Sequence, residues 1–548
     1  MSEVPDSKRV DDDVSTVSGA AGHETVIGVF PRAEKERRAR LFEGLSQAFP
    51  VTFEGREAGD VAGLDGCLFL GSPDGPAPAT IPSLTYLNAR PAGTSRSPGR
   101  VELEQSAIVE QPLRGRALDD REALGAERVP VDPGDEVLAS ADGRPLWLAR
   151  AHNGGRSYVA DLAPDELGDE ESLRDLLVEG RFMSFLPLVH FLREACGQNG
   201  WQRPPLRACF IIDDPNLHWP SYGGIRYREL AQDARERGYH VTMAMVPLDG
   251  WFAHPTASRI FRDSSRELSL AVHGNDHVKW ELDRPRRDGY LPLGARALRR
   301  ISAFERRSGV QVARVMVPPH DRCAQEALLP FARVGFDAIM LPFGHRSSSD
   351  LLASWEAAEF RESLSVVKRR NFRADMAEWT LMAYLGQPLI AYGHERNLRK
   401  GFDVLANLSS AFNSFGSVDW MSLGDIVHSN FATRRTGSVL RVRMFSRRVR
   451  VQPDADVETV VVELPPTHHA PDQERIVVYR DGQTAEADFD VRSSSGPIPV
   501  LGGTGPLEIR LVRTDAVRPE DVRRGRPQVF SYVRRGLAES LERASALR

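Results

Sequence analysis

Short apolar runs alternate with longer amphipathic stretches in the first third of the chain. Residues 25–30 (TVIGVF) have the composition of a buried strand, and residues 33–48 have the apolar spacing of a helix. The same reasoning predicts further strands at residues 51–53, 67–70, 137–139, 146–149 and 157–160, and a helix at residues 182–196. Strands that alternate with helices predict an α/β domain over residues 25–198, flavodoxin-like or amidotransferase-like in outline.

Two segments of this region lack such a pattern. Residues 71–100 are rich in Pro, Gly, Ser and Ala, a composition that predicts a loop. Residues 1–24 are polar and acidic and contain too little apolar surface to form a core, so we expect them to be disordered.

Residues 199–432 form a second strand–helix repeat, in which polar residues follow the strand ends. Strands are predicted at residues 207–212, 240–246, 268–272, 312–317, 338–341 and 388–392, with helices at residues 227–237 and 296–307. The polar residues that follow strands are Asp213 and Asp214, His273, His320, and His394. Polar residues at the C-terminal ends of strands are typical of an α/β barrel, whose active site lies at that rim.

The hydrophobic pattern changes again after residue 432. Segments between residues 436 and 515 alternate apolar and polar positions and are separated by Pro and Gly. This alternation predicts a small antiparallel β-sandwich over residues 433–515. Residues 516–548 are highly charged, and we expect a helical tail there.

Composition and charge narrow the class of protein. The 548 residues carry a formal net charge of -5, which argues against a nucleic-acid binder with a concentrated basic face. The sequence has no run of apolar residues long enough to span a membrane, and residues 1–24 lack an apolar signal-peptide core. A cytoplasmic protein is therefore expected. Cys67 begins an apolar strand and has no matching histidine after it, which favours a buried thiol over an amidotransferase nucleophile.

The segment His273-Gly274-Asn275-Asp276-His277 carries the strongest chemical signal. Two histidines four residues apart lie on one face if the segment turns as a helix, and such a pair suits one metal ion. A hydrolytic metal site needs a third ligand and open positions for water, and Asp213-Asp214, about 60 residues upstream, supply a carboxylate. Both acids follow an apolar run, so their burial requires a compensating cation.

With these motifs, residues 207–430 resemble the polysaccharide deacetylase family, also called carbohydrate esterase family four or the NodB-homology domain. In that family a strand ends in two aspartates, as Ile211-Ile212-Asp213-Asp214 does, and a His-Ser/Thr-x-x-His motif follows, which HGNDH matches. The resemblance implies a distorted α/β barrel of about seven strands. It also implies the site roles: Asp213 as the catalytic base, His394 as the general acid, and Asp214, His273 and His277 as the metal ligands.

Further residues near the rim are candidates for binding the substrate. The family has a Pro-containing rim motif, which Val317-Pro318-Pro319-His320 matches. The substrate-binding candidates are Pro319, His320, Trp219, Tyr222 and Asn275. Aromatic residues near a rim are more often packed than available to a sugar, so packing is the alternative interpretation of Trp219 and Tyr222.

Three positions depart from the family pattern. Pro215 stands where the family has Gly, and Gly274 stands where it has Ser or Thr. Val317 replaces an Arg that, in the family, steadies the catalytic Asp. His320 and Asp321 are the expected sources of the missing polar contact.

The function that these observations predict is a metal-dependent hydrolase that deacylates an N-acetylated sugar or polysaccharide precursor. Zinc suits the Asp-His-His ligand set, and cobalt, nickel, iron and manganese are alternatives. Two other functions fit the sequence: a catalytically silent barrel that binds carbohydrate or a protein partner, and a hydrolase of carbon–nitrogen bonds in a small cytosolic metabolite. The sequence predicts no oligomeric state.

Overall fold

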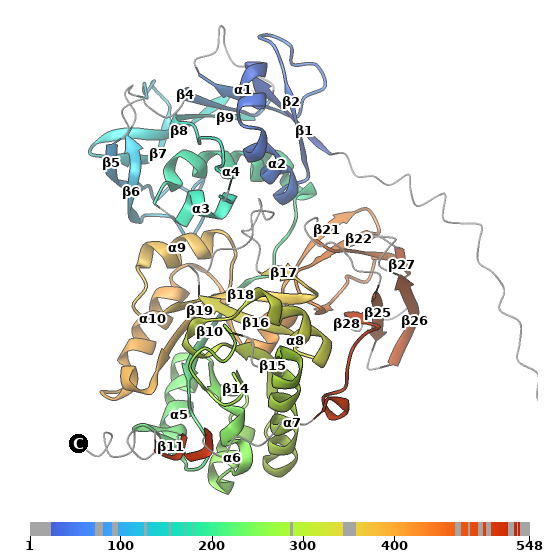
Figure 1. Ribbon diagram of the computed structural model, residues 1–548. Coiled ribbons are helices and arrows are strands. Elements are labelled where there is room, and N and C mark those ends of the chain that lie inside the picture. The colour runs from blue at the N-terminus through green and yellow to red at the C-terminus, as the bar shows by residue number, and fades with distance from the viewer. Residues whose placement is uncertain are drawn as a thin grey trace, which may run out of the picture.

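The computed structural model describes most of the chain in three units (Figure 1). The described residues are 24–71, 81–89, 97–124, 129–152, 155–169, 171–178, 180–284, 289–342, 358–465, 473–480, 483–490, 497–499, 506–523, 531–533 and 535–537. The segment expected to be disordered, residues 1–24, lies outside this description apart from Glu24.

The first unit is built on a mixed sheet of nine described strands in the order β2-β1-β3-β4-β9-β8-β7-β5-β6. The strands are β1 (Thr25–Phe30), β2 (Val51–Gly55), β3 (Gly66–Leu70), β4 (Ser83–Asn88), β5 (Ser97–Leu103), β6 (Ala117–Leu124), β7 (Glu136–Ala141), β8 (Arg144–His152) and β9 (Gly155–Leu162). The parallel part, β2-β1-β3-β4-β9, has the strand order of a flavodoxin-like sheet, and the remaining strands extend it in antiparallel fashion.

Four helices pack with this sheet: α1 (Arg32–Arg37), α2 (Ala39–Ala48), α3 (Leu173–Val178) and α4 (Phe182–Cys196). The prediction of a loop over residues 71–100 is wrong in part, because β4 lies inside that range and β5 begins in it. The first four side chains of β4 are buried, and the strand pairs with β3 on one side and β9 on the other. These partner strands stabilise β4, although the neighbouring Pro- and Gly-rich sequence predicts a loop. Cys67 is fully buried, and burial raises the pKa of its thiol to about 11.

The second unit is a closed barrel of seven parallel strands, as the sequence predicts. Its strands are β10 (Leu206–Asp213), β13 (Val241–Met245), β14 (Leu268–His273), β15 (Val312–Val317), β16 (Ala338–Pro342), β18 (Leu364–Asn371) and β19 (Leu389–His394). They run in the order β13-β14-β15-β16-β18-β19-β10, and the β10–β13 pairing closes the ring. Strand β18 was not predicted, because its second half reads Lys-Arg-Arg-Asn and resembles a surface segment.

Short strands, helices and 3-10 turns precede, connect or follow the barrel strands. The additional strands are β11 (Ser221–Tyr222), β12 (Ile225–Arg226), β17 (Glu359–Arg361) and β20 (Val418–Trp420). The helices are α5 (Tyr227–Arg237), α6 (Pro255–Asp263), α7 (Tyr290–Ser308), α8 (Leu328–Val334), α9 (Met376–Tyr384), α10 (Asp403–Asn413) and α11 (Leu423–His428). Single 3-10 turns are η2 (Gly197–Asn199), η3 (Pro247–Trp251), η4 (Pro319–Asp321), η5 (Gln325–Ala327) and η6 (Glu395–Leu398). The helix α5 ends at Gly238 in the left-handed conformation, as its sequence predicts.

The third unit is a β-sandwich with one core between two four-stranded sheets. One sheet has the order β21-β22-β24-β27 and the other β23-β28-β25-β26. The strands are β21 (Phe431–Thr436), β22 (Val439–Met444), β23 (Arg448–Val451), β24 (Thr459–Glu463), β25 (Glu474–Arg480), β26 (Gln483–Asp490), β27 (Pro497–Pro499) and β28 (Leu507–Arg513). The antiparallel prediction is wrong for one pair, since β22 and β24 run parallel.

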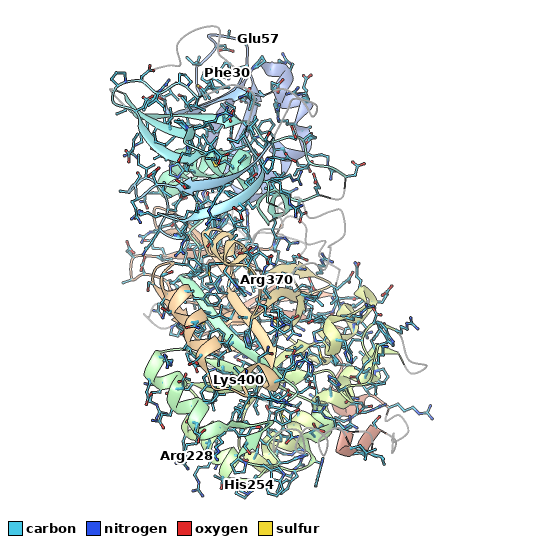
Figure 2. All side chains as sticks on the ribbon, turned by 90° about the vertical axis from the view of Figure 1, so that its left-hand side faces the viewer. Phe30, Glu57, Arg228, His254, Arg370 and Lys400 are labelled. Carbon is cyan, nitrogen blue, oxygen red and sulfur yellow. The ribbon has the colours of Figure 1, made fainter. Side chains whose placement is uncertain are left out.

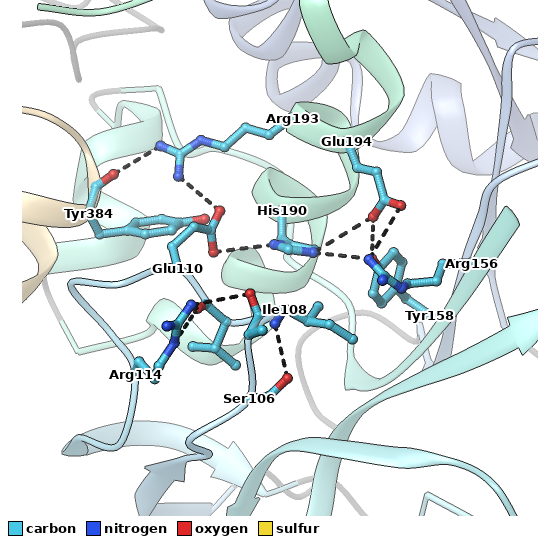
Figure 3. Close-up of polar contacts among 12 residues, drawn as sticks. Ser106, Ile108, Glu110, Arg114, Arg156, Tyr158, His190, Arg193, Glu194 and Tyr384 are labelled. Atoms are coloured by element: carbon cyan, nitrogen blue, oxygen red, sulfur yellow. Dashed lines mark hydrogen bonds and ion pairs between the residues drawn. The ribbon is translucent and has the colours of Figure 1, made fainter.

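The first unit and the barrel share apolar packing through helix α9. Leu381, Tyr384 and Leu385 belong to the same buried cluster as the core of the first unit. Arg193 on α4 reinforces this contact, because its guanidinium donates to the Tyr384 carbonyl at 3.0 Å and lies 4.3 Å from the ring centroid of Tyr384 (Figure 3). Glu110 accepts from Arg193 at 3.2 Å and lies at the same distance from the His190 ring.

The chain returns to the barrel after the sandwich. The predicted helical tail is described only as a 3-10 turn, η7 (Pro519–Asp521), and as helical residues at 531–533 and 535–537. Among the described helices, none has the length and apolar character needed to cross a membrane.

Candidate metal centre

Strand alternation directs a set of polar side chains into the barrel. Cys209 and Ile211 on β10 belong to a buried cluster with interior residues of the other barrel strands, whereas Phe210 and Ile212 belong to the outer cluster with the helices. Asp213 continues the inner series of β10, since side chains two residues apart share a face. The same rule gives inner positions to His273 after Ala271 on β14 and to His394 after Ile390 on β19. These side chains therefore meet where the parallel strands end.

Asp214, His273 and His277 converge at this end of the barrel. The Nε2 atoms of His277 and His273 lie 3.1 Å and 3.7 Å from Oδ1 of Asp214. One ligand atom of each residue lies within 4.8 Å of the others, a spacing compatible with a single metal ion. Two imidazole nitrogens and a carboxylate oxygen are a common donor set for zinc and related ions.

The ring orientation of His273 is fixed by the neighbouring strand. Its Nδ1 lies 2.9 Å from the carbonyl oxygen of Val317, a contact in which only Nδ1–H can donate. The neutral ring then has its lone pair on Nε2, which faces Asp214. Val317 thus contributes to the site through its backbone carbonyl, which orients the His273 ring.

The loop from His273 to His277 is not helical, so the premise that a helical turn brings the two histidines together is wrong. His277 has a φ of 53°, and Gly274 has a φ of 61°. The carboxylate of Glu281 holds the loop by accepting from the backbone N–H groups of Asn275, Asp276 and His277 at 3.1, 2.8 and 3.0 Å. A Cβ atom on Gly274 would lie 2.5 Å from Pro319 and 2.6 Å from Glu281. Close packing and the positive φ therefore account for the glycine at this position.

The charge state of the three residues fits a bound cation. Oδ1 of Asp214 is buried and accepts no hydrogen bond from the described residues. Burial opposes ionisation of Asp214, but His273, His277 and Arg535 outweigh it and lower its pKa to about 2. Burial also lowers the pKa of His277, because it disfavours the charged imidazolium, and the neutral imidazole has a lone pair that can bind a metal. A buried carboxylate oxygen that faces two imidazole nitrogens and accepts no hydrogen bond is the feature a divalent ion would satisfy.

Asp213 is held by an arginine that the sequence did not single out. Arg369 on β18 donates to Oδ1 of Asp213 at 2.9 Å and to Asp321 at 2.6 Å. Tyr392 donates to the other oxygen of Asp321 at 2.6 Å, and its ring lies 4.0 Å from the Arg369 guanidinium. Burial disfavours the charged guanidinium, but the two carboxylates outweigh it and raise the pKa of Arg369 above its usual value. Arg369 thus places a positive charge beside Asp213. Its guanidinium also links Asp321 to Asp213, because it donates to both carboxylates.

His394 lies at the end of β19, where it is paired in register with Asp213 on β10. Its ring accepts the backbone N–H of Asn397, and the Asn397 side chain accepts the backbone N–H of His394 at 2.9 Å. This double contact fixes the ring. Because one ring nitrogen accepts, a neutral imidazole must carry its proton on the other nitrogen.

The substrate-binding candidates divide by exposure. Trp219 is 50% exposed, and His320 is exposed with its ring centroid 5.1 Å from that of His277. Tyr222 and Pro319 are buried. Asn275 is fully buried and its amide oxygen accepts from Arg300 at 2.7 Å, which favours a structural role in the loop. The two exposed residues are therefore the ones that a ligand can reach directly.

Several residues near the candidate metal centre have a left-handed backbone conformation. Eight described residues other than glycine have a positive φ, and five of them are Asp214, His277, Trp280, His320 and Asp321. Left-handed backbone is unfavourable for residues with a side chain and persists where the surrounding structure fixes it. Such a concentration is typical of a functional site.

Comparisons with known proteins return only structural similarities. No family model and no curated protein matches the chain. A family four carbohydrate esterase from Streptomyces lividans, solved in complex with acetate, is 14% identical, with a TM-score of 0.25, over 39% of this chain and 88% of the esterase. A Mycobacterium smegmatis protein described as a polysaccharide deacetylase is 14% identical, with a TM-score of 0.31, over 41% of this chain and 92% of that protein. A family four pseudoenzyme from Bacillus anthracis is 9% identical, with a TM-score of 0.24, over 40% of this chain and 64% of the pseudoenzyme. Over about two fifths of its length, this chain is similar to the family four carbohydrate esterases that its motifs resemble.

Proposed function

We propose that this protein is a metal-dependent hydrolase that removes the acyl group from an N-acylated sugar. The observation that carries the proposal is the meeting of Asp214, His273 and His277 around one buried carboxylate oxygen, with the restrained acid Asp213 beside them. Three protein ligands leave positions open for water and substrate, as hydrolytic metal sites require.

The metal would be held by Oδ1 of Asp214 and by Nε2 of His273 and His277. When bound by these residues, a divalent ion would supply Lewis-acid chemistry, which polarises an acyl carbonyl and makes a bound water more acidic. Zinc suits the donor set best, with cobalt, nickel, iron and manganese as alternatives.

Asp213 is the proposed general base. Arg369 binds Oδ1 of Asp213 and keeps its side chain in the inner position at the end of β10. The carboxylate accepts a proton from the water that attacks the acyl carbon. The amide carbon–nitrogen bond then breaks, and the products are a carboxylic acid and a free amine on the sugar.

His394 is the proposed general acid. Its ring accepts from the backbone of Asn397, so the proton of the neutral imidazole sits on the other ring nitrogen. The proton on that nitrogen is the one that His394 would transfer to the leaving amine. The pairing of His394 with Asp213 on neighbouring strands supports acid and base roles in one site.

Metal content and acetate release test this function together. We expect about one metal per chain in the purified protein by elemental analysis, and its loss in His277→Ala. Asp213→Asn should retain the metal but release acetate from N-acetylglucosamine oligomers at least about 100-fold more slowly. Asp454→Asn, at an exposed carboxylate of the sandwich, is the matched control.

Each outcome separates the competing functions. A wild-type protein that binds none of zinc, cobalt, nickel, iron or manganese contradicts the hydrolase. Bound metal without hydrolysis of any N-acylated substrate favours the catalytically silent binding barrel. Hydrolysis of small N-acyl metabolites, with the oligomers left intact, favours the third candidate.

A further inference from the structure

The C-terminal segment returns from the sandwich to the metal end of the barrel. After β28, the backbone N–H of Val517 donates to the backbone carbonyl oxygen of Arg333 at 2.8 Å, and Val522 packs in the apolar cluster between the barrel strands and their helices. Arg299 on α7 donates to the carbonyl of Val522 at 2.9 Å. The described residues 531–533 and 535–537, drawn in red, then lie beside β11 in Figure 1. Contacts of Arg535 with the Asp214 region place this segment against the barrel.

Arg535 reaches the metal centre from this segment. Its Nε donates to the Asp249 carboxylate at 2.8 Å, and one terminal nitrogen donates to the backbone carbonyl of Asp214 at 2.8 Å. The second terminal nitrogen lies 3.6 Å from Oδ1 of Asp214. The Arg535 side chain is 8% exposed and that of Asp249 4%, so this ion pair is buried.

The contacts of Arg535 indicate that it supports Asp214 and does not compete with a metal ion for Oδ1 of Asp214. A separation of 3.6 Å is too long for a hydrogen bond, so Oδ1 of Asp214 keeps its acceptor capacity. The charge of Arg535 is balanced by Asp249, which leaves the negative charge of Asp214 available to a cation. Asp214 has a φ of 78°, and both of its backbone groups are held, the N–H by Ala244 and the carbonyl by Arg535.

A second contact joins the segment to the histidine loop. The Tyr532 hydroxyl lies 3.5 Å from a terminal nitrogen of Arg300, and the guanidinium lies 5.8 Å from the Tyr532 ring centroid. Arg300 donates to the side chains of Asn275 and Asp276, which lie between the two histidine ligands. The segment thus contacts the centre on the Asp214 side and on the histidine side.

We propose that Arg535 is a positioning residue of the metal centre, and that the docked residues 531–533 and 535–537 and the bound metal stabilise each other. This inference rests on the metal site of the proposed function. Because coupling between two binding events is reciprocal, a segment that strengthens metal binding must itself be held more firmly when metal is bound. A segment that competed with the metal would instead be released by it.

Hydrogen–deuterium exchange of the full chain distinguishes these two cases. We expect saturating Co²⁺ to slow exchange in the peptide that spans residues 531–537 by about tenfold, since the coupling acts on docking. The same peptide should not respond in His277→Ala, which lacks a ligand. Unchanged or faster exchange in the metal-bound wild type would overturn the inference.

Metal affinity supplies the second measurement. We expect Arg535→Met to weaken Co²⁺ binding by about 10- to 100-fold in titration calorimetry, the usual effect of losing a residue that supports a ligand. Arg523→Met, at an exposed position in the same C-terminal region, should bind Co²⁺ like the wild type. Equal or tighter binding by Arg535→Met would contradict the proposal. If that variant does not fold, the exchange experiment on the wild type decides alone.

The two proposals fail in different ways. A wild-type protein that binds no metal overturns the proposed function and this inference with it. A wild type that binds metal, together with an Arg535→Met variant of equal affinity, overturns this inference alone.

Discussion

Arg369 and Asp213 come from strands that are not neighbours in the barrel, since β19 lies between β18 and β10. Arg369 bridges Asp213 and Asp321, two carboxylates that would otherwise lie close together without a cation. A planar guanidinium can bind both at once, whereas the single ammonium of lysine binds them poorly. The position at the end of β18 therefore requires arginine in particular.

Replacing Arg369 by lysine tests this requirement. We expect Arg369→Lys to lower the rate of acetate release by about 100-fold with metal content unchanged, because Asp213 loses its fixed orientation. Arg369→Met should also lower the free energy of unfolding by about 3–5 kcal/mol, since it leaves a buried carboxylate unpaired. Arg373→Lys, at an exposed position in the following loop, is the control. Wild-type activity in Arg369→Lys would show that Asp213 needs only a nearby positive charge.

Gly274 illustrates how packing and backbone conformation together can require a glycine. Its φ of 61° and the closeness of Pro319 and Glu281 leave no room for a side chain. We expect Gly274→Ser to lower the free energy of unfolding by about 2–4 kcal/mol, through left-handed strain and overpacking. The histidine loop should also bind metal less tightly.

Urea unfolding and metal titration of Gly274→Ser and Gly238→Ser measure this effect. Gly238 has a φ of 71° and open space where a Cβ would be, so its variant isolates the backbone strain. Equal losses of stability in the two variants would exclude a steric cause.

Segments with a strong hydrophobic pattern form the helices and strands that the sequence predicts. Segments with a weak or mixed pattern contain strands that the sequence analysis did not predict. The helix at residues 182–196 has the predicted bounds, since its continuous apolar character allows only a buried position. Strands β4 and β18 were missed because flanking residues or charges conceal their apolar positions. Both are held by strands on either side, information that a local pattern does not contain.

Helix α4 and its partners form a polar contact with a defined pH response. Burial opposes ionisation of Glu110, but His190 and Arg193 outweigh it and lower its pKa to about 2 (Figure 3). The folded pKa lies below the unfolded value, so this carboxylate stabilises the fold above about pH 4.5, and the effect is lost as the pH falls toward 2.

Glu110→Gln should therefore be less stable than the wild type at neutral pH. The difference should be about 1–3 kcal/mol at pH 7 and should shrink by about 1 kcal/mol at pH 3.5, as linkage requires. Urea unfolding at the two pH values measures it, with the exposed Glu102→Gln as control. A difference that grows on acidification would contradict the sign of the shift.

At the scale of the whole molecule, the first unit and the barrel share one buried apolar contact. Figure 2 shows Phe30 and Glu57 at one end of the molecule and His254 at the other, with α9 between these ends. Leu381 and Tyr384 of α9, and Leu385 directly after it, are buried in the core of the first unit. Their apolar surface is covered only when both units are present.

A chain that begins at residue 199 should expose this surface. We expect it to bind a hydrophobic dye and to unfold at least about 5 °C below the barrel transition of the full chain, because the contact stabilises α9. Scanning calorimetry and dye fluorescence measure both effects, and Leu381→Ser with Leu385→Ser in the shortened chain should reduce dye binding. A shortened chain with an unchanged transition would show that the units are independent.

The sequence alone determined the kinds of element and the position of the chemistry along the chain. Apolar strands followed by Asp213-Asp214 and by His273 predict a barrel rim with metal-binding residues, because strand alternation and residue chemistry are local properties. Tertiary structure decided which groups surround them. Arg369 reaches Asp213 across 156 positions, and Arg535 reaches Asp214 across 321, so only the closed barrel and the returning C-terminal segment bring these cations to the site.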